Sequence, residues 1–223
     1  MAPNDARTAW TEHGSSLFAY GDGAGRVRVA LGRDHRGPCA AFRLLPAEPP
    51  TLDQLQVPQV EGWITARGLV LIAGPSGAGK TVTLGAIVRA LGERRRRVIM
   101  IEDPIELVHV SPSISQRAVG PHVASIAIGV RAAMHEGVDA ISIEHVGSSE
   151  AAEAIVDAVA GGHLVLATVN APTADLALER VLDAVPVDRR DHARKLLSEN
   201  LLGAIRPVPA RNGSRTFEVT GRS

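Results

Sequence analysis

Cysteine is nearly absent from this sequence. Cys39 is the one cysteine among 223 residues, so an intrachain disulfide is excluded and a metal site built from cysteines is disfavoured. We expect Cys39 to be a small, buried apolar residue. Aromatic residues make up only 3% of a chain that is 45% hydrophobic, which predicts a core of Val, Leu, Ile and Ala. This composition favours a parallel sheet covered by helices on both faces.

The chain also lacks net charge and long apolar runs. Its 24 basic and 24 acidic residues balance to zero, so no nucleic-acid partner is predicted. No run approaches the ~18 apolar residues of a membrane span, and the N-terminus lacks the basic and apolar regions of a signal peptide. We therefore expect a cytoplasmic protein with one sizeable α/β domain and a small appendage.

What the sequence does contain is a phosphate-binding loop after the apolar segment 69–73. Its glycines allow successive backbone N–H groups to surround a triphosphate, and a predicted helix over 81–91 points its N-terminal dipole at the phosphates. Lys80 is expected to reach the β and γ oxygens and Thr81 to ligate Mg²⁺, so the predicted cofactors are ATP and Mg²⁺. The predicted nucleotide-binding residues are Gly74, Pro75, Ser76, Gly77, Ala78, Gly79, Lys80, Thr81 and Val82.

The N-terminal part of the chain is expected to differ from the rest. Residues 1–14 are polar and small, and we expect them to be disordered. Two strand-like runs follow at 27–31 and 39–44, joined by a turn rich in Gly, Arg, Asp and His. Prolines then break the pattern at 46–50, where we place a linker, so that 15–50 is a hairpin followed by this linker.

From residue 51 onward, strands and helices are expected to alternate. Two short helices open this part, one capped by Thr51 and one near Val60. Apolar strand-like runs and helical stretches then follow in turn, which is typical of a doubly wound, mostly parallel sheet. The expected strands are 69–73, 98–101, 140–143 and 164–167, and the expected helices are 81–91, 123–135, 149–160, 174–184 and 188–202.

Several motifs downstream of the loop resemble those of one family. The string IEDPIELVH at 101–109 is similar to the acidic box of the secretion ATPase superfamily, and GHLVLAT at 162–168 is similar to its histidine box. The chain therefore resembles the type II/IV secretion ATPases, and especially the PilT-like retraction ATPases of type IV pili. This resemblance implies a P-loop NTPase (RecA-like) α/β fold, with 51–223 as the ATPase domain and 15–50 as a truncated β-hairpin or α+β remnant of the family's N-terminal domain.

The resemblance also implies roles for individual residues. Glu106 is the candidate general base, with Glu102 and Asp103 as partners that hold metal or position water. Asp103 joins Thr81 as a candidate metal ligand, although its position before a proline suits a helix cap equally. His163, in the histidine box, is the candidate sensor of the γ-phosphate.

The arginines allow two interpretations. In a ring of subunits, Arg26, Arg28, Arg43 and Arg131 are candidates to reach a nucleotide in trans, whereas in a monomer the first three would form a solvated face of the hairpin. The resemblance implies a homo-hexamer, or a mixed ring with full-length relatives, acting with an inner-membrane platform protein of a pilus or secretion machine. A cytoplasmic chain would then lie peripherally at the inner membrane.

Departures from the family pattern leave hydrolysis open. The Walker B strand of relatives ends in Gly-Glu, whereas this chain reads Glu144-His145, which puts a histidine at the glutamate position. Glu144 would need a local bulge to replace it, because adjacent strand residues point to opposite faces. Asn170 replaces the second histidine of the histidine box, and the chain is shorter than its relatives at both ends. The sequence thus predicts an ATP-binding protein that either hydrolyses ATP to drive pilus retraction or secretion, or is a hydrolysis-deficient regulatory or assembly subunit.

Overall fold

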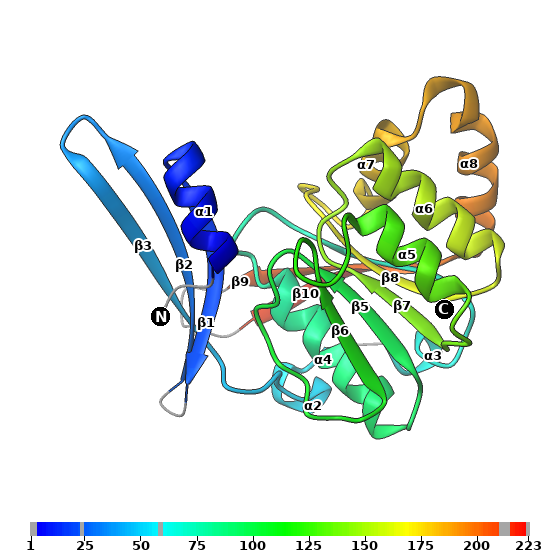
Figure 1. The fold of residues 1–223 in the computed structure, drawn as a ribbon. Coiled ribbons are helices and arrows are strands. Elements are labelled where there is room, and N and C mark those ends of the chain that lie inside the picture. The colour runs from blue at the N-terminus through cyan, green and yellow to red at the C-terminus, as the bar shows by residue number, and fades with distance from the viewer. Residues whose placement is uncertain (1–3, 23–24, 58–59, 210–214, 222–223) are drawn as a thin grey trace.

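The chain folds into a small sheet and a larger, helix-covered sheet (Figure 1). The structure, a computed structural model, describes residues 4–22, 25–57, 60–209 and 215–221. Between the two sheets, the proline-rich segment 46–50 contains neither helix nor strand, as its composition predicted. Among the described residues, no helix combines the length and apolar composition that a bilayer crossing requires.

The small sheet consists of β1 (Ser16–Asp22), β2 (Gly25–Asp34) and β3 (Gly37–Leu45), which pair antiparallel in that order. β2 and β3 contain the two predicted runs, whereas β1 was not predicted. The sheet carries Cys39 on β3, an edge strand with one neighbour, so this cysteine is exposed and its expected burial is wrong.

Helix α1 (Asn4–His13) lies beside the small sheet, where the sequence predicted a disordered segment. Two contacts explain the difference. Ala6 is buried, and the Arg33 guanidinium on β2 lies 4.7 Å from the centre of the Trp10 ring. A cation over an aromatic face is attracted by the ring's negative charge, so the helix is attached through a contact that its own polar composition does not reveal.

The larger sheet has seven strands, and all neighbouring pairs are parallel except the pair at one edge, β10 with β9. This confirms the predicted doubly wound, mostly parallel sheet. The strands at its two edges, β6, β9 and β10, were not predicted. In spatial order the strands are β10 (Arg215–Gly221), β9 (Leu201–Pro209), β4 (Gly68–Ala73), β8 (Leu164–Val169), β7 (Ala140–Ile143), β5 (Val98–Glu102) and β6 (Ile114–Ala118).

Helices cover both faces of this sheet because its central strands are apolar on both sides. Leu69 and Leu71 of β4 pack into one buried cluster, and Val70 and Ile72 pack into another on the opposite face. The first cluster includes residues of α5 (Ile126–Met134), α6 (Ser149–Ala160), α7 (Ala177–Ala184) and α8 (Val187–Asn200). The second includes residues of α3 (Val60–Trp63) and α4 (Lys80–Glu93).

The short helix α2 (Leu52–Leu55) begins where the sequence predicted a cap. The Thr51 hydroxyl accepts a hydrogen bond from the N–H of Gln54 at 3.1 Å, and the Gln54 side chain accepts one from the Thr51 N–H at 2.8 Å. This reciprocal pair satisfies two backbone donors that a helix start would otherwise leave free.

The topology brings distant chain segments to one edge. Parallel strands end at the same side of a sheet, so the residues that follow β4, β5, β7 and β8 meet at their carboxyl ends. The small sheet reaches this edge as well, because Arg26 and Arg28 of β2 contact residues 105–106, which follow β5.

Candidate functional site

The phosphate loop lies between the end of β4 and the start of α4. Gly77 and Gly79 adopt φ values of +82° and +102°, a left-handed region that side chains with a Cβ rarely occupy. Gly79 is also the N-cap residue of α4. Having no side chain, it leaves the first N–H groups of the helix open to an anion. The loop therefore has the backbone that a phosphate cradle requires.

Lys80 is held within this loop by neutral acceptors. Its Nζ donates to the carbonyl oxygens of Gly74 at 2.8 Å and Pro75 at 2.9 Å, and to Oδ1 of Asn170 at 2.9 Å. Burial lowers the pKa of Lys80, although the nearby Glu144 carboxylate opposes this shift. Phosphate oxygens can replace such carbonyl and amide acceptors, and they add a favourable charge interaction.

Glu144 reaches Thr81 from the end of β7. The Thr81 hydroxyl donates a hydrogen bond to Oε1 of Glu144, while the Glu144 N–H still donates to the Ile101 carbonyl at 3.0 Å. His145 then adopts a left-handed φ of 66°, and its N–H donates to the Thr168 hydroxyl at 2.7 Å. Alternation along β7 puts Glu144 on the same face as Ala140, which packs in the cluster that contains α4, so its carboxylate meets Thr81 without a bulge. Glu144 and His145 both line one cavity.

The pKa of Glu144 is shifted by the same surroundings. Burial raises it to about 7, the Thr81 hydrogen bond opposes the rise, and the neighbouring Glu106 carboxylate adds to it. A carboxyl group in such a place gains from any cation that enters the cavity, because the cation favours its ionised form.

The acidic loop after β5 contains two buried carboxyl groups with different partners. Glu106 is only 3% exposed and forms an ion pair with Arg28. Glu102 is 2% exposed and accepts a hydrogen bond from Nε2 of Gln116 at 2.8 Å. Burial raises the pKa of Glu102 to about 8, and the Gln116 hydrogen bond opposes this rise.

A cavity of about 380 Å³ lies where these segments meet. A second cavity of about 530 Å³ adjoins it and shares Arg43 and Glu106, and it extends along Val82 and the linker. The first cavity is lined by Leu17, Arg28, Arg43, Ser76, Gly77, Gly79, Lys80, Thr81, Asp103, Glu106, Ile126, Glu144, His145, Thr168 and Asn170.

The family model of type II/IV secretion system proteins matches residues 35–201, which include the loop, the acidic box and the end of β7. The chain belongs to this family. The match also covers the departures at Glu144, His145 and Asn170, so these are variations within a secretion-type domain.

Relatives of known sequence and structure agree with this membership in the secretion family. The twitching motility protein of Neisseria gonorrhoeae is 33% identical over 202 residues, covering 88% of this chain and 53% of that protein. The type IV pilus retraction ATPase PilT of Pseudomonas aeruginosa is 33% identical over 188 residues, covering 82% and 55%. A crystal structure of the pilus retraction motor PilT with bound ADP matches 100% of this chain and 68% of its own, with a TM-score of 0.86 and 31% identity. The chain spans about half the length of these two curated relatives.

Several predicted site residues do not line the 380 Å³ cavity of this secretion-family chain. They are Gly74, Pro75, Ala78 and Val82 of the phosphate-loop segment, and Arg26, Glu102, Arg131 and His163. Glu102 is buried behind it, as described above. His163 precedes β8, and its carbonyl accepts from the Gly68 N–H at 3.2 Å, at the amino end of the strands. The cavity lies at their carboxyl end, a strand length of roughly 20 Å away, so His163 does not face the phosphate loop of its own chain.

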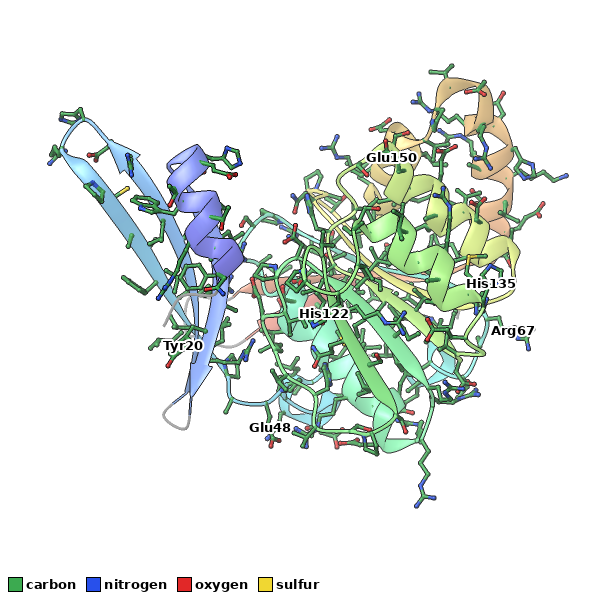
Figure 2. All side chains as sticks on the ribbon, in the orientation of Figure 1. Tyr20, Glu48, Arg67, His122, His135 and Glu150 are labelled. Atoms are coloured by element: carbon green, nitrogen blue, oxygen red, sulfur yellow. The ribbon has the colours of Figure 1, made fainter. Side chains whose placement is uncertain are left out.

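Arg131 also lies outside the cavity, in the last turn of α5. The first residue of that helix, Ile126, lines the cavity, so Arg131 is more than a turn distant from it. Figure 2 shows His135, which follows α5, on the side of the larger sheet away from the small sheet. Neither Arg131 nor His135 therefore contributes to the cavity of this chain.

Sequence reasoning gave no role to two residues that organise the site. Thr168 receives the His145 N–H, and Gln116 binds both Glu102 and the Leu107 carbonyl, at 2.8 and 2.7 Å. Thr168 had a detectable signal, since it ends an apolar strand at the ligand-binding edge. Gln116 had none, because it lies on a strand with no clear alternation. Asp103 lines the cavity and begins no helix, so the capping alternative is wrong.

The oxygen atoms of the cavity suit Mg²⁺. The Thr81 hydroxyl meets the Glu144 carboxylate there, and Asp103 lines the same space. Within the part of the chain that the structure describes, no three His, Cys, Asp or Glu side chains are grouped to hold a metal alone. Mg²⁺ in phosphate sites usually takes one or two protein oxygens and completes its shell with phosphates and water, so the donor set fits this ion.

Proposed function

We propose that this chain is an ATP-binding domain that hydrolyses ATP in the cavity beside the phosphate loop. One observation supports this above all: Lys80 and Thr81 of a complete loop face the carboxylates of Glu106 and Glu144 across a single cavity. The base and ribose of the nucleotide would occupy the adjoining 530 Å³ cavity beside Val82.

The residues have distinct tasks in this mechanism. Lys80 exchanges its carbonyl and Asn170 acceptors for β and γ oxygens of ATP. Thr81, Glu144 and Asp103 would hold Mg²⁺, which when bound neutralises charge on the phosphates. Glu106 orients a water molecule for in-line attack on the γ-phosphorus and accepts its proton through a carboxylate oxygen. The P–O bond to the β-phosphate breaks, and ADP leaves with that electron pair.

We further propose that hydrolysis drives pilus retraction or secretion. The family membership and the twitching and retraction relatives support this role. The chain would work in a ring, either homo-hexameric or shared with full-length relatives, against an inner-membrane platform protein. It would lie on the cytoplasmic side of that membrane.

The test of this proposal is Mg²⁺-dependent phosphate release at saturating ATP and high protein concentration. Lys80→Ala should abolish nucleotide binding and release. Glu106→Gln should retain binding and lose roughly 10²-fold or more in turnover, which is typical of a removed general base. Release by the unaltered chain that does not exceed the Lys80→Ala background would refute hydrolysis, while fluorescent ATP binding would show separately whether the nucleotide site exists.

A hydrolysis-deficient regulatory subunit is the second candidate. It is favoured by His145, an imidazole that lines the cavity at the glutamate position of relatives. An imidazole cannot supply the charge of a carboxylate beside Mg²⁺. If this residue limits turnover, His145→Glu should raise phosphate release at least about tenfold. An unchanged rate would reject His145 as the limiting defect.

A further inference from the structure

Two arginines of the small sheet contact the acidic loop from one strand face. Arg26 and Arg28 stand two residues apart on β2, so their side chains point to the same side. Nε of Arg26 donates to the Glu106 carbonyl and its terminal nitrogen to the Ile105 carbonyl, both at 2.8 Å. Arg28 forms the ion pair with the Glu106 carboxylate. The loop is therefore held at its backbone by one arginine and at its side chain by the next.

The burial of Glu106 makes the Arg28 contact necessary. Its side chain is 4% exposed, whereas that of Arg28 is 33% exposed, so the carboxylate has little water to solvate its charge. Two further buried carboxyl groups, those of Glu144 and Glu102, lie in the surroundings of Glu106. A buried carboxylate among other acids is kept in one place and one charge state only if a cation pairs with it.

We infer that Arg28 and Arg26 are positioning residues for Glu106 of their own chain. Arg28 fixes the direction of the Glu106 carboxylate, and Arg26 fixes the backbone that carries it. This inference rests on the proposed role of Glu106 as the base. It differs from both earlier interpretations, since it has these arginines act in cis, on the acidic loop of their own chain.

Arg43 provides a contrast within the same sheet. It lies directly across from Arg28 on β3 and lines both cavities. Among the described residues, Arg43 has no ion-pair partner, whereas the charge of Arg28 is already matched by Glu106. Like charges directly opposite on neighbouring strands repel, and the pair with Glu106 relieves this repulsion on one side. Arg43 is therefore a better candidate than Arg28 to bind phosphate.

A double-mutant cycle tests the inference through turnover. Arg28→Gln should lower kcat about 100-fold, the size expected when a reacting group is misplaced, and change the nucleotide Kd less than about threefold. In a Glu106→Gln background the same change should lower kcat no further, because the group that it positions is gone. Arg28→Lys should restore part of kcat. Effects of Arg28→Gln and Glu106→Gln that multiply, or a loss that lies mainly in Kd, would overturn the inference.

Amide hydrogen exchange provides a readout that does not need turnover. Arg26→Gln should raise exchange across residues 105–109 about tenfold and leave the phosphate loop 74–81 unchanged. Arg36→Gln, in the exposed turn between β2 and β3, is the matched control and should change neither segment. Thermal unfolding of each variant identifies any that fails to fold, and Arg26→Lys then replaces it.

The two readouts separate this inference from the proposed function. If the unaltered chain hydrolyses no ATP, the proposed function fails. Raised exchange at 105–109 in Arg26→Gln would still support the positioning of this loop by Arg26. Unchanged exchange at 105–109 in both Arg26→Gln and Arg26→Lys would refute the positioning of this loop by Arg26, whatever the rate of ATP hydrolysis.

Discussion

The Thr81 hydroxyl at the start of α4 donates a hydrogen bond to the Glu144 carboxylate at the end of β7. This contact identifies Glu144 as an acid that can bind a metal beside Thr81. The family motif predicts a glutamate at the position of His145, whereas strand alternation puts the Glu144 carboxylate on the α4 face, where it accepts a hydrogen bond from the Thr81 hydroxyl. A carboxylate therefore lines the cavity from position 144, one residue before the position that the family motif predicts. Whether an acid can bind a metal in this cavity therefore depends on the direction of its side chain, and the conformation of the backbone sets that direction.

Glu144→Gln should weaken nucleotide binding only when Mg²⁺ is present. The amide keeps a hydrogen-bond acceptor for Thr81 but loses the charge, so we expect ADP affinity to fall about 10- to 100-fold with Mg²⁺ and to change little with EDTA. Titration calorimetry in the two buffers measures this. Glu150→Gln, an exposed acid near the start of α6, is the matched control (Figure 2). An equal loss in both buffers would contradict a role for Glu144 toward the ion.

His109 should make the fold sensitive to acid. Burial lowers the pKa of His109 to about 4, and the Arg89 charge contributes. Its unfolded value is 6.5, so the unfolded chain binds the proton first, and stability is lost as pH falls from about 6.5 to about 4. Glu102 and Glu144 act in the opposite sense, because their raised pKa values of about 8 and about 7 remove stability as pH rises above 4.5. The contribution of His109 is therefore measured as a difference between variants.

The difference between variants isolates the histidine. His109→Asn should reduce the slope of unfolding free energy against pH in that window by up to about 1.4 kcal/mol per pH unit. Urea unfolding at several values between pH 4.5 and 7 measures it. His192→Asn, exposed on α8, should leave the slope as it is. If both variants keep the full slope, the acid sensitivity lies in other groups.

At the scale of elements, the predictable parts were those with strong local patterns. The apolar runs of β4, β5, β7 and β8 and the helices between them follow from periodicity and from the phosphate loop. β6, β9 and β10 do not, because their sequences carry polar residues or prolines, and only pairing with neighbouring strands makes them regular. His163 shows a further limit: the motif suggested a phosphate contact, whereas the direction of β8 puts that residue at the wrong edge.

The packing of α3 on β9 is a second feature that sequence patterns do not reveal. A Cβ on Gly203 would lie 2.2 Å from an atom of the Trp63 ring, so the indole occupies the space that a side chain would need. Gly203→Ala should therefore destabilise the fold by about 1–3 kcal/mol. Gly62, one residue before the tryptophan, has open space at its Cβ, and Gly62→Ala should be neutral or slightly stabilising. Urea unfolding compares the two, and equal effects would show that this contact does not limit stability.

At the scale of the whole molecule, the site is divided between the two sheets. Lys80 and Thr81 of α4 and Glu144 after β7 belong to the part built around the larger sheet, whereas Arg28 and Arg43 lie on strands of the small one. The sequence predicted the loop and the acidic box but left the arginines between two interpretations, because a contact across about 80 residues has no local signature. A ligand in this cavity would contact both sheets and so bind only the assembled molecule.

ATP should therefore stabilise the whole chain in one transition. A ligand at 100 times its Kd adds about 2.7 kcal/mol to the unfolding free energy. For a chain of this length that corresponds to a rise in Tm of roughly 5–10 °C. Calorimetric unfolding with ATP and Mg²⁺ measures the shift. The fluorescence transitions of Trp10 on α1, beside the small sheet, and of Trp63 on α3, against the larger sheet, followed in single-tryptophan variants, should shift together. Lys80→Ala should lose the shift, and AMP, which lacks β- and γ-phosphates, should produce little. A shift with AMP as large as that with ATP would contradict the phosphate loop as the main contact, whereas a shift confined to Trp63 would mean that the small sheet does not contribute to nucleotide binding.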